Sequence, residues 1–308
     1  MRKFELTILG CGAAAPTPSF LTTSQLVNIH DHFILIDCGE GCQLTLRKLK
    51  LKFQRIKTVL ISHMHADHVM GLPGLLASMN LLGRKTPIEI FGPEELESFV
   101  RTIWHKTGTH IDFPVQFKVV DSTKPSLLLE MKSYKIEAFP TKHRIPTCGF
   151  KIEELRGNWN LKPETKDLYN LSYHEINILK KGESITRKGG VVVDPNKCCI
   201  APVKSRSYVF AADTAFTPKV IDGALNATLL YHEATFMESE KSIATKTMHS
   251  TASDAGRVAC EANVERLMIG HFSNRYKVLD GLLAEARAVF ENTLLANEGE
   301  TVSIDNLD

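Results

Sequence analysis

The sequence lacks several features that would assign it to a class of protein at once. No apolar run approaches the ~18 residues of a membrane-spanning helix, and no internal repeat or low-complexity segment is visible in the 308 residues. Charge of one sign is also missing, since 37 Lys and Arg face 35 Asp and Glu and leave a formal net charge of +2. This balance excludes a histone-like coat of positive charge, although a local basic patch would still suffice to bind nucleic acid.

Cysteine is present in an odd number and without a pairing pattern. The seven cysteines include no two Cys-x-x-Cys pairs, so a zinc ribbon has no support. A chain of this length can bury a core without disulfides, and a reduced, cytoplasmic protein is therefore expected. The N-terminus resembles a signal peptide only in outline, because Glu5 and Gly10 interrupt its apolar residues and residues 4–9 alternate as a strand does.

Short apolar segments rich in Val, Ile, Leu and Phe alternate with helical patterns along the chain. The segments predict strands at residues 4–9, 25–29, 33–36, 58–61, 88–91, 134–139, 208–211, 228–231 and 266–269. Helices are predicted at residues 41–48, 93–103, 253–262 and 279–295. Strands mixed with helices predict an α/β fold in which layers of helix cover a sheet.

Residues 153–204 depart from this rhythm. They are polar, with one strand-like run at 191–193, and an amphipathic helix is predicted over 163–181 with Gly182 ending it. We interpret the segment as an arm inserted into a single domain of residues 1–308, and not as a second core. Four basic residues of the arm are candidates for phosphate contacts: Lys180, Lys181, Arg187 and Lys188. A solvated arm of mixed charge is the alternative, because lysines near a helix C-terminus are favoured without any ligand.

The segment His63-Met64-His65-Ala66-Asp67-His68 carries the clearest chemical signal. Three imidazoles and a carboxylate within six residues are costly to hold together unless a cation joins them. His63 and His65 can face one point from an extended turn, while Asp67 and His68 face another, which favours two metal positions over one. The alternative is a chance cluster in an exposed polar loop, and the ordered apolar flanks of the segment argue against it.

An apolar segment also precedes each of four further candidates, which are His143, Asp213, Glu233 and His271. The carboxyl ends of strands are where α/β proteins build their sites. Any one of these histidines, taken singly, would more often be a structural residue. Together, beside the histidine cluster, they are predicted to be ligands. Imidazole and carboxylate without thiolate suit Zn²⁺, with Mn²⁺ and Fe²⁺ as alternatives.

This set of residues resembles the metallo-β-lactamase superfamily, whose signature is reproduced by His63-x-His65-x-Asp67-His68. The resemblance implies an αββα sandwich that holds two metal ions, usually zinc. It implies that one metal is held by His63, His65 and His143. The second would be held by Asp67, His68 and His271, and Asp213 would bridge both.

Within the superfamily the chain resembles more closely the ribonuclease Z family of tRNA 3′-processing endonucleases. The resemblance rests on Leu9-Gly10-Cys11-Gly12, Asp37-Cys38-Gly39-Glu40, Gly71-Leu72-Pro73-Gly74-Leu75-Leu76, His232-Glu233-Ala234-Thr235 and Met248-His249-Ser250-Thr251. It implies that a metal-bound hydroxide, oriented by Asp67, attacks the phosphodiester of precursor tRNA and removes the 3′ trailer. His249, held by Glu233, would protonate the departing ribose 3′-oxygen and leave a 3′-OH on the tRNA.

The resemblance further implies a homodimer in which the arm of one subunit grips the tRNA for the other subunit's site. Two departures from the family pattern bear on substrate choice. Residues 15–22 lack the Lys and Arg of the PxKxRN loop, which leaves discrimination against CCA-bearing tRNA open, and the arm has no clear Gly-Pro knuckle.

Other functions compete with this interpretation. Glu233 could be a strand-end surface carboxylate, and His249 a helix-entry cap. The chain could then be a small-molecule phosphodiesterase or a thioester or lactone hydrolase of the same fold, or a broader RNA nuclease that does not discriminate against CCA. An RNA-binding protein that has lost catalysis is a further alternative. Glu233 with His249 favours phosphodiester chemistry, and the presence of all seven expected ligands argues against lost catalysis.

Overall fold

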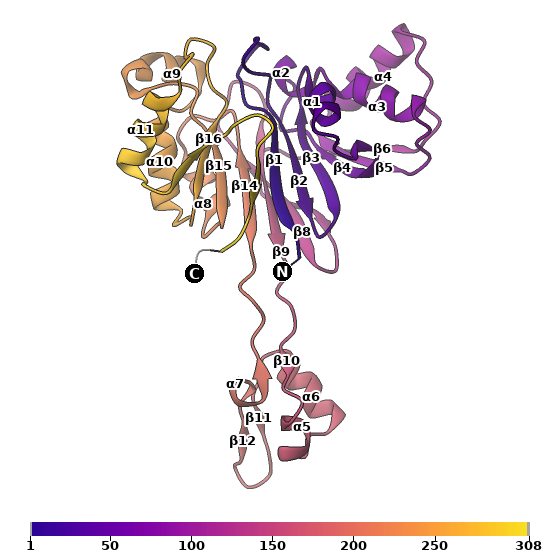
Figure 1. Cartoon of the computed structure of the whole chain (residues 1–308), viewed down its shortest axis with the longest axis vertical. Helices are drawn as coiled ribbons and strands as arrows, with labels where there is room; N and C mark the ends of the chain where they lie inside the picture. Colours follow the sequence, from indigo (N-terminus) through magenta and orange to yellow (C-terminus); the bar gives the residue numbers. More distant parts are fainter. Residues whose placement is uncertain (1, 307–308) are drawn as a thin grey trace. The chain divides into compact units, whose positions relative to one another are not determined.

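The computed structural model describes residues 2–306 (Figure 1). Contacts among the Cα atoms divide the chain into two compact units. The larger unit consists of Met1–Glu130, Ile136–Ile152 and Arg206–Asp308, and the smaller one of Met131–Lys135 and Glu153–Ser205. The larger unit contains two seven-stranded sheets.

The first sheet has the strand order β18-β1-β2-β3-β4-β5-β6. Its strands are β1 (Phe4–Gly10), β2 (Ser24–Ile29), β3 (His32–Cys38), β4 (Ile56–Leu60), β5 (Ile88–Gly92), β6 (Val115–Val119) and β18 (Thr301–Ser303). Antiparallel pairing joins β18, β1, β2 and β3, and parallel pairing joins β3 to β6. The five strands predicted in this part of the chain are confirmed, and β6 and β18 are additional.

The second sheet has the order β17-β16-β15-β14-β9-β8-β7. Its strands are β7 (Ser126–Glu130), β8 (Tyr134–Pro140), β9 (Cys148–Glu154), β14 (Ser207–Ala211), β15 (Leu229–Glu233), β16 (Leu267–Gly270) and β17 (Thr293–Leu295). Strands β14 to β17 pair in parallel. Parallel strands are usually buried on both faces, which explains the continuous apolar runs that predicted β14, β15 and β16.

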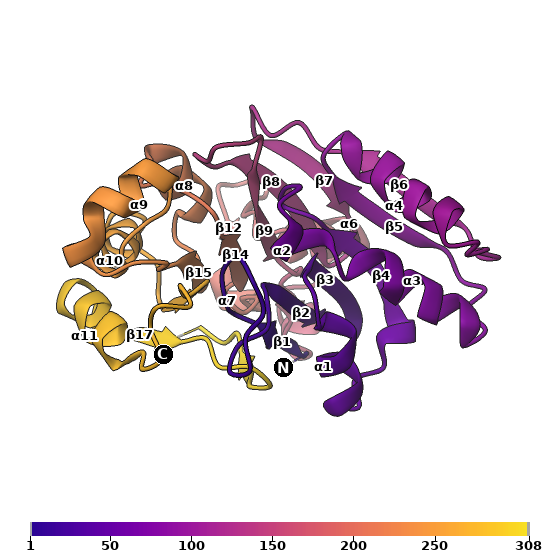
Figure 2. The same ribbon diagram turned by 90° about the horizontal axis from the view of Figure 1, so that it is seen from above.

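Helices cover the outer faces of the two sheets (Figure 2). Those of the first half are α1 (Cys42–Lys48), η1 (Phe53–Arg55), α2 (Ala66–Val69), α3 (Leu72–Leu81) and α4 (Glu95–Lys106). Those of the second half are α8 (Pro218–Ala224), η2 (Glu238–Glu240), α9 (Lys241–Thr247), α10 (Ala252–Glu261) and α11 (Asp280–Val289). Leu46, Leu76 and Val100 place α1, α3 and α4 in one buried cluster with residues of the first sheet. The αββα sandwich is therefore confirmed.

Helix α10 shows how the sequence sets a helix start beside the predicted catalytic residues. The Thr251 hydroxyl accepts the N–H of Asp254, and the Asp254 carboxylate accepts the N–H of Thr251. This capping box satisfies two backbone donors at the helix N-terminus. It fixes the chain two residues after His249.

The smaller unit contains the segment interpreted as an arm. Its elements are β10 (Asn160–Leu161), α5 (Thr165–Leu168), α6 (Tyr173–Lys180), β11 (Ile185–Thr186), β12 (Val192–Val193), α7 (Pro195–Cys198) and β13 (Cys199–Ile200). Leu171, Leu179 and Cys198 belong to a small apolar cluster within this unit, which the sequence interpretation did not include.

Two helix predictions require correction. The helix expected over 163–181 is broken into α5 and α6, because Asn170 adopts a left-handed conformation with φ 45° and Ser172 starts a new helix with a capping box to Glu175. The helix expected over 279–295 ends at Val289, and residues 293–295 form β17, because they pair in parallel with β16. Within residues 2–306, no helix is both long enough and apolar enough to cross a membrane.

Candidate metal and catalytic centre

The predicted site residues lie at one edge of the sandwich, where strands of both sheets end. His63 and His65 follow β4, and the short helix α2, labelled at the top of Figure 1, carries Asp67 and His68. The other four residues follow or end strands of the second sheet: His143 after β8, Asp213 after β14, Glu233 at the end of β15 and His271 after β16. The edge predicted from the strand pattern is therefore where these side chains meet.

Four side chains form the first group of possible metal ligands. One ligand atom from each of His63, His65, His143 and Asp213 lies within 4.8 Å of the others. His65 Nδ1 is 2.9 Å from His63 Nε2 and 3.3 Å from His143 Nε2. Asp213 Oδ2 is 3.5 Å from Nε2 of both His63 and His143. Nitrogen and carboxylate oxygen atoms thus converge on one point.

The second group consists of Asp67, His68 and His271, and the other oxygen of Asp213 faces it. Asp213 Oδ1 is 3.2 Å from His68 Nε2 and 3.0 Å from His271 Nε2. Asp67 Oδ2 is 3.5 Å from His68 Nε2 and 3.6 Å from His271 Nε2. Asp213 therefore presents one carboxylate oxygen to each group, an arrangement suited to a bridging ligand.

Hydrogen bonds on the far side of the rings aim the histidines inward. His68 Nδ1 donates to Asp37 Oδ2 at 2.6 Å, and His143 Nδ1 donates to the Met248 carbonyl at 3.0 Å. His271 Nδ1 donates to Thr235 Oγ1 at 2.9 Å. Each bond holds a proton on Nδ1, so Nε2 is the ring nitrogen that would bind a metal.

The buried polar atoms at the centre of the site fit a cation. His68 Nε2, His271 Nε2 and Asp213 Oδ1 are buried and have no hydrogen-bond partner among the described residues. A buried polar atom without a partner is costly, and three that face one another are satisfied together by a shared positive ion. The donor set of imidazole and carboxylate is one that divalent transition metals accept.

The charges of the site act on one another strongly. Burial would raise the pKa of Asp213, but the surrounding His271, His68 and His63 outweigh it and lower that pKa well below its usual range. Burial would likewise lower the pKa of His271, but Asp213 and Asp67 raise it to about 10. The buried Asp213 carboxylate is therefore ionised, and it is stabilised by positive charge on the groups beside it.

Glu233 and His249 form a hydrogen-bonded pair next to the two groups. His249 Nδ1 donates to Glu233 Oε1 at 2.9 Å, which leaves His249 Nε2 toward the pocket. Glu233 is fully buried and also accepts hydrogen bonds from Thr214 N–H, Thr235 Oγ1 and Ser250 N–H. Burial disfavours the His249 imidazolium, but the Glu233 carboxylate outweighs it and raises the pKa of His249.

His249 has a second possible role. One ligand atom each from Asp213, His249 and His271 lies within 4.8 Å of the others, so His249 could also join a metal. Its hydrogen bond to a buried, fully occupied carboxylate is the arrangement of an imidazole that holds and releases a proton.

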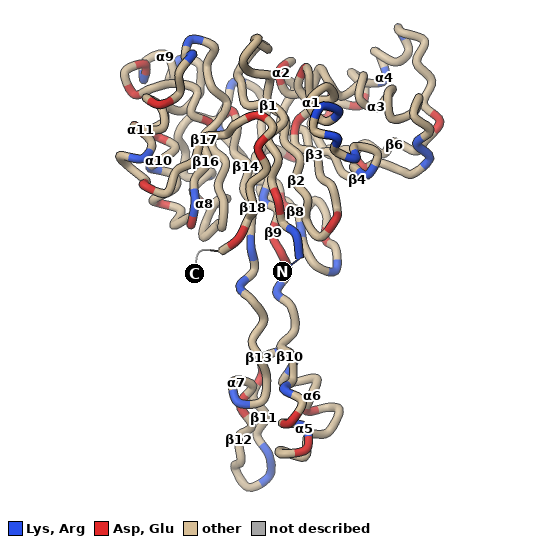
Figure 3. The backbone as a smooth tube through the Cα atoms, in the orientation of Figure 1, with Lys and Arg blue, Asp and Glu red and all other residues tan. Residues whose placement is uncertain are grey.

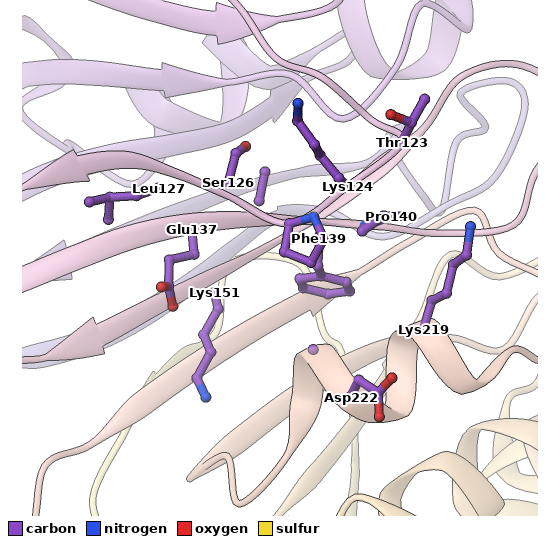
Figure 4. Close-up of a pocket in the computed structure, with 13 residues that line it drawn as sticks. Thr123, Lys124, Ser126, Leu127, Glu137, Phe139, Pro140, Lys151, Lys219 and Asp222 are labelled. Carbon is purple, nitrogen blue, oxygen red and sulfur yellow. The ribbon is translucent and has the colours of Figure 1, made fainter.

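The site opens into a pocket of about 450 Å³, lined by residues of both groups and by His249, Arg144, Phe236 and Asn274. A second cavity, of about 520 Å³, lies between α8 and β7 and contains none of the predicted ligands (Figure 4). Lys124, Lys151 and Lys219 line it together with Glu137 and Asp222, so its charges nearly balance. The predicted chemistry therefore belongs to the first pocket.

Comparison with known proteins identifies the family. The chain is 41% identical over 307 residues to the ribonuclease Z of Phocaeicola vulgatus, covering 100% of this chain and 99% of that protein. It is 40% identical over 304 residues to the ribonuclease Z of Bacteroides fragilis, covering 99% and 100%. The chain belongs to the ribonuclease Z family. It is a hydrolase of the endoribonuclease class.

One solved structure is of a tRNase Z, a second shares the fold, and a family model matches the first half of the chain. The short form of human tRNase Z superimposes with a TM-score of 0.70 at 26% identity, covering 98% of this chain and 99% of that one. The metallo-β-lactamase fold protein YhfI from Bacillus subtilis shares the fold, with a TM-score of 0.69 at 20% identity over 98% and 99% of the chains. The family model described as Anti-Pycsar protein Apyc1 matches residues 4–158, which include the histidine cluster and end before Asp213.

The four basic residues of the arm that were predicted as candidates for phosphate contacts are not equivalent in the structure. Lys180 and Lys181 are exposed at the end of α6, and Lys188 is exposed in the turn between β11 and β12, where Figure 3 marks basic residues in blue. Arg187 is half-buried and donates to Glu175 Oε1 at 2.7 Å. Arg187 thus has a structural contact within the arm.

Three residues that sequence reasoning missed contribute to this ribonuclease Z site. Asp37 orients His68, Arg144 lines the pocket, and the backbone N–H of Ala14 donates to Asp67 Oδ2 at 2.8 Å. Ala14 does so from a left-handed conformation with φ 65°. Asp37 stood in a motif that carried the resemblance, and Arg144 follows His143 directly, so both could have been found by asking what surrounds each ligand.

Proposed function

We propose that this chain removes the 3′ trailer from precursor tRNA and leaves a 3′-OH on the tRNA. The observation that carries the proposal is the combination, in one pocket, of two groups of metal ligands with the Glu233–His249 pair. Metal ligands alone are common to hydrolases of this fold. A buried carboxylate that holds an imidazole beside them supplies the proton that a departing sugar oxygen requires.

The metal-binding residues follow from the two groups. His63, His65 and His143 would hold one divalent cation, Asp67, His68 and His271 a second, and Asp213 would contact both. We propose Zn²⁺ for both positions, because imidazole and carboxylate suit it, with Mn²⁺ and Fe²⁺ as alternatives that accept the same ligands. Bound there, the cations would supply a nucleophile at neutral pH and offset the charge of the phosphate.

The chain's own residues orient the reactants and move protons. Asp67 Oδ2, held by the Ala14 N–H, faces the pocket and would orient the attacking water and accept its proton. The pKa of Asp67 supports an ionised carboxylate, since burial would raise it but His68 and His271 outweigh burial and lower it.

His249 would act on the opposite side of the reaction. His249 lines the pocket, and Glu233 Oε1 keeps its ring in place through Nδ1. The other ring nitrogen, Nε2, would give a proton to the departing ribose 3′-oxygen. Glu233 contacts no reactant in this scheme and is a positioning residue. Without it the imidazole would lose both its orientation and its nearby negative charge.

The arm and the assembly complete the proposal. Lys180, Lys181 and Lys188 would contact tRNA phosphates, supported by their exposure, and Arg187 would hold the arm's own fold. We propose a homodimer, supported by the exposed apolar side chains of Leu44, Met70, Leu81 and Leu82. We also propose a cytoplasmic location, supported by the free state of all seven cysteines.

Incubation with precursor tRNA that carries a 3′ trailer tests the proposed function. We expect cleavage after the discriminator base, loss of cleavage in chelator, and loss in Asp67→Ala. A second precursor that ends in CCA tests whether residues 15–22, which lack Lys and Arg, permit cleavage of CCA-bearing tRNA. Hydrolysis of bis(p-nitrophenyl) phosphate without any action on precursor tRNA would instead identify a small-molecule phosphodiesterase.

A further inference from the structure

The pocket at the metal and catalytic centre contains a cation that the proposed reaction does not use. Arg144 lines this pocket together with His65, Asp67 and His249. It is the only Lys or Arg among the described residues that line it. Its side chain is exposed, and within residues 2–306 it forms no ion pair. An exposed, positively charged residue therefore lines the space that the substrate must enter.

The backbone that carries Arg144 is fixed in place. The N–H of Lys142 donates to Thr214 Oγ1 at 3.1 Å, one residue after Asp213. The next residue, His143, donates from Nδ1 to the Met248 carbonyl at 3.0 Å. The position of Arg144 is therefore tied to the elements that carry Asp213 and His249, while its guanidinium stays free to meet a ligand.

The chemistry of the pocket indicates what this ligand is. Asp67 and Asp213 line the same pocket and repel a polyanion. The scissile phosphate would be met by the cations of the metal centre, but an RNA strand brings a further phosphate on each side of it. Residues 15–22, which follow the pocket residue Ala14 in the chain, contain no Lys or Arg that could bind either neighbour. Guanidinium is suited to a phosphodiester because it can donate two parallel hydrogen bonds.

We propose that Arg144 binds the phosphate adjacent to the scissile phosphate and so selects a polynucleotide over a single diester. The inference rests on the proposed function, in which the substrate is RNA. Arg144 takes no part in bond breaking, and a substrate with one phosphate cannot engage it. The residue therefore determines specificity, and its effect depends on the substrate that is offered.

Steady-state kinetics of the metal-loaded enzyme test this inference with two substrates. For Arg144→Ala we expect kcat/KM on precursor tRNA to fall about 10-fold, mainly through KM. Hydrolysis of bis(p-nitrophenyl) phosphate, which has no adjacent phosphate, should be unchanged. Arg144→Lys should restore part of the loss, because it keeps the charge without the paired donors. Lys106→Ala, at the exposed end of α4, removes the same charge elsewhere and should match the wild type.

Binding supplies a second readout that does not require cleavage. A precursor analogue with a hydrolysis-resistant methylphosphonate at the scissile position keeps the adjacent phosphates and removes the central charge. We expect Arg144→Ala to weaken its binding and to lower the slope of log Kd against log salt by about 1. Metal content and far-UV circular dichroism of the variant should equal those of the wild type.

The outcomes separate this inference from the proposed function. A variant that matches the wild type in KM and in salt slope overturns the role of Arg144 and leaves the nuclease function intact. Equal loss on both substrates places Arg144 on the scissile phosphate and also overturns it. A wild-type enzyme that hydrolyses the small diester but neither cleaves nor binds precursor tRNA overturns both proposals.

Discussion

Asp37→Asn is expected to weaken metal binding without unfolding the chain. Asp37 is fully buried, and its Oδ2 accepts hydrogen bonds from His68 Nδ1 at 2.6 Å and from Ser62 Oγ at 2.8 Å. Asparagine preserves the size of the side chain but would present an N–H₂ group to His68. The proton of the ring would then move to Nε2, the atom that faces Asp213, where it prevents metal binding.

The expected loss of metal affinity follows from the role of residues that orient a metal-binding histidine. Loss of the partner that orients a metal-binding histidine typically costs 10–100-fold in affinity, or about 1.4–2.7 kcal/mol. The hydrogen bonds of Asp37 involve a charged group, so the metal-free chain should also lose about 1.5–3 kcal/mol of unfolding free energy. Zn²⁺ affinity measured by competition with a chromophoric chelator, beside urea unfolding of the same samples, separates the two effects.

Asp121→Asn is the matched control for this substitution. Asp121 is exposed and accepts hydrogen bonds from the N–H and hydroxyl of Thr123, so the same chemical change occurs at a carboxylate that is bonded to no predicted ligand among the described residues. Its metal affinity should equal that of the wild type. If Asp37→Asn also binds both metal ions with wild-type affinity, the view that Asp37 sets the proton position on His68 is wrong.

Three further predictions follow from the site and the arm. His249→Ala should lower kcat on precursor tRNA by about 10²–10⁴-fold, measured at saturating substrate, with bound metal unchanged. Gly39→Ala should lower both Tm and metal content, because a Cβ there would lie 2.3 Å from the Asp67 carbonyl oxygen. Hydrogen bonds from Arg187, which has the largest effect, and from Ser172 lower the pKa of Glu175 to about 2. The contact between Arg187 and Glu175 therefore stabilises α6 at pH values above 4.5, the ordinary pKa of the carboxyl group, and this stabilisation is lost as the pH falls toward 2. An NMR titration of α6 would show the loss, and Glu175→Gln would abolish the pH dependence.

Matched variants control for the first two of these predictions. His110→Ala removes an exposed histidine and should leave kcat unchanged. Gly74→Ala places a Cβ in open space on α3 and should leave Tm and metal content at or above wild-type values. Loss of metal in His249→Ala would identify His249 as a ligand, in line with its place near ligand atoms of Asp213 and His271, and contradict its assignment as a proton donor.

The metal-binding edge was predictable because two independent signals in the sequence coincide there. The dense cluster at residues 63–68 indicates a cation, and the apolar strands before His143, Asp213 and His271 place those residues at the same sheet edge. The residues around them were not predictable by the same reasoning. Asp37 and Ala14 act through hydrogen bonds that only the packing of β3 and of the first loop against α2 creates.

The two wrong helix predictions failed for different reasons. The break between α5 and α6 was visible in principle, since Ser172 and Glu175 have the spacing of a capping box, but the amphipathic pattern continues through it. The end of α11 had no such signal. Residues 293–295 resemble a continuing helix in composition and become a strand only because β16 offers them a parallel partner.

The formal net charge of +2 is a poor guide to how this chain binds RNA. Four carboxylates, of Asp37, Asp67, Asp213 and Glu233, stand within the hydrogen-bond network of one site, and three of them are almost completely buried. Their negative charge would repel the phosphodiester that the site must accept. Two divalent cations would add four positive units at that point, which the count over the sequence omits. Arg144 is the only Arg or Lys among the described residues that line this pocket, and we propose that it binds the phosphate next to the scissile one. Attraction for RNA at this site should therefore depend on bound metal and on Arg144, and very little on the net charge of the chain.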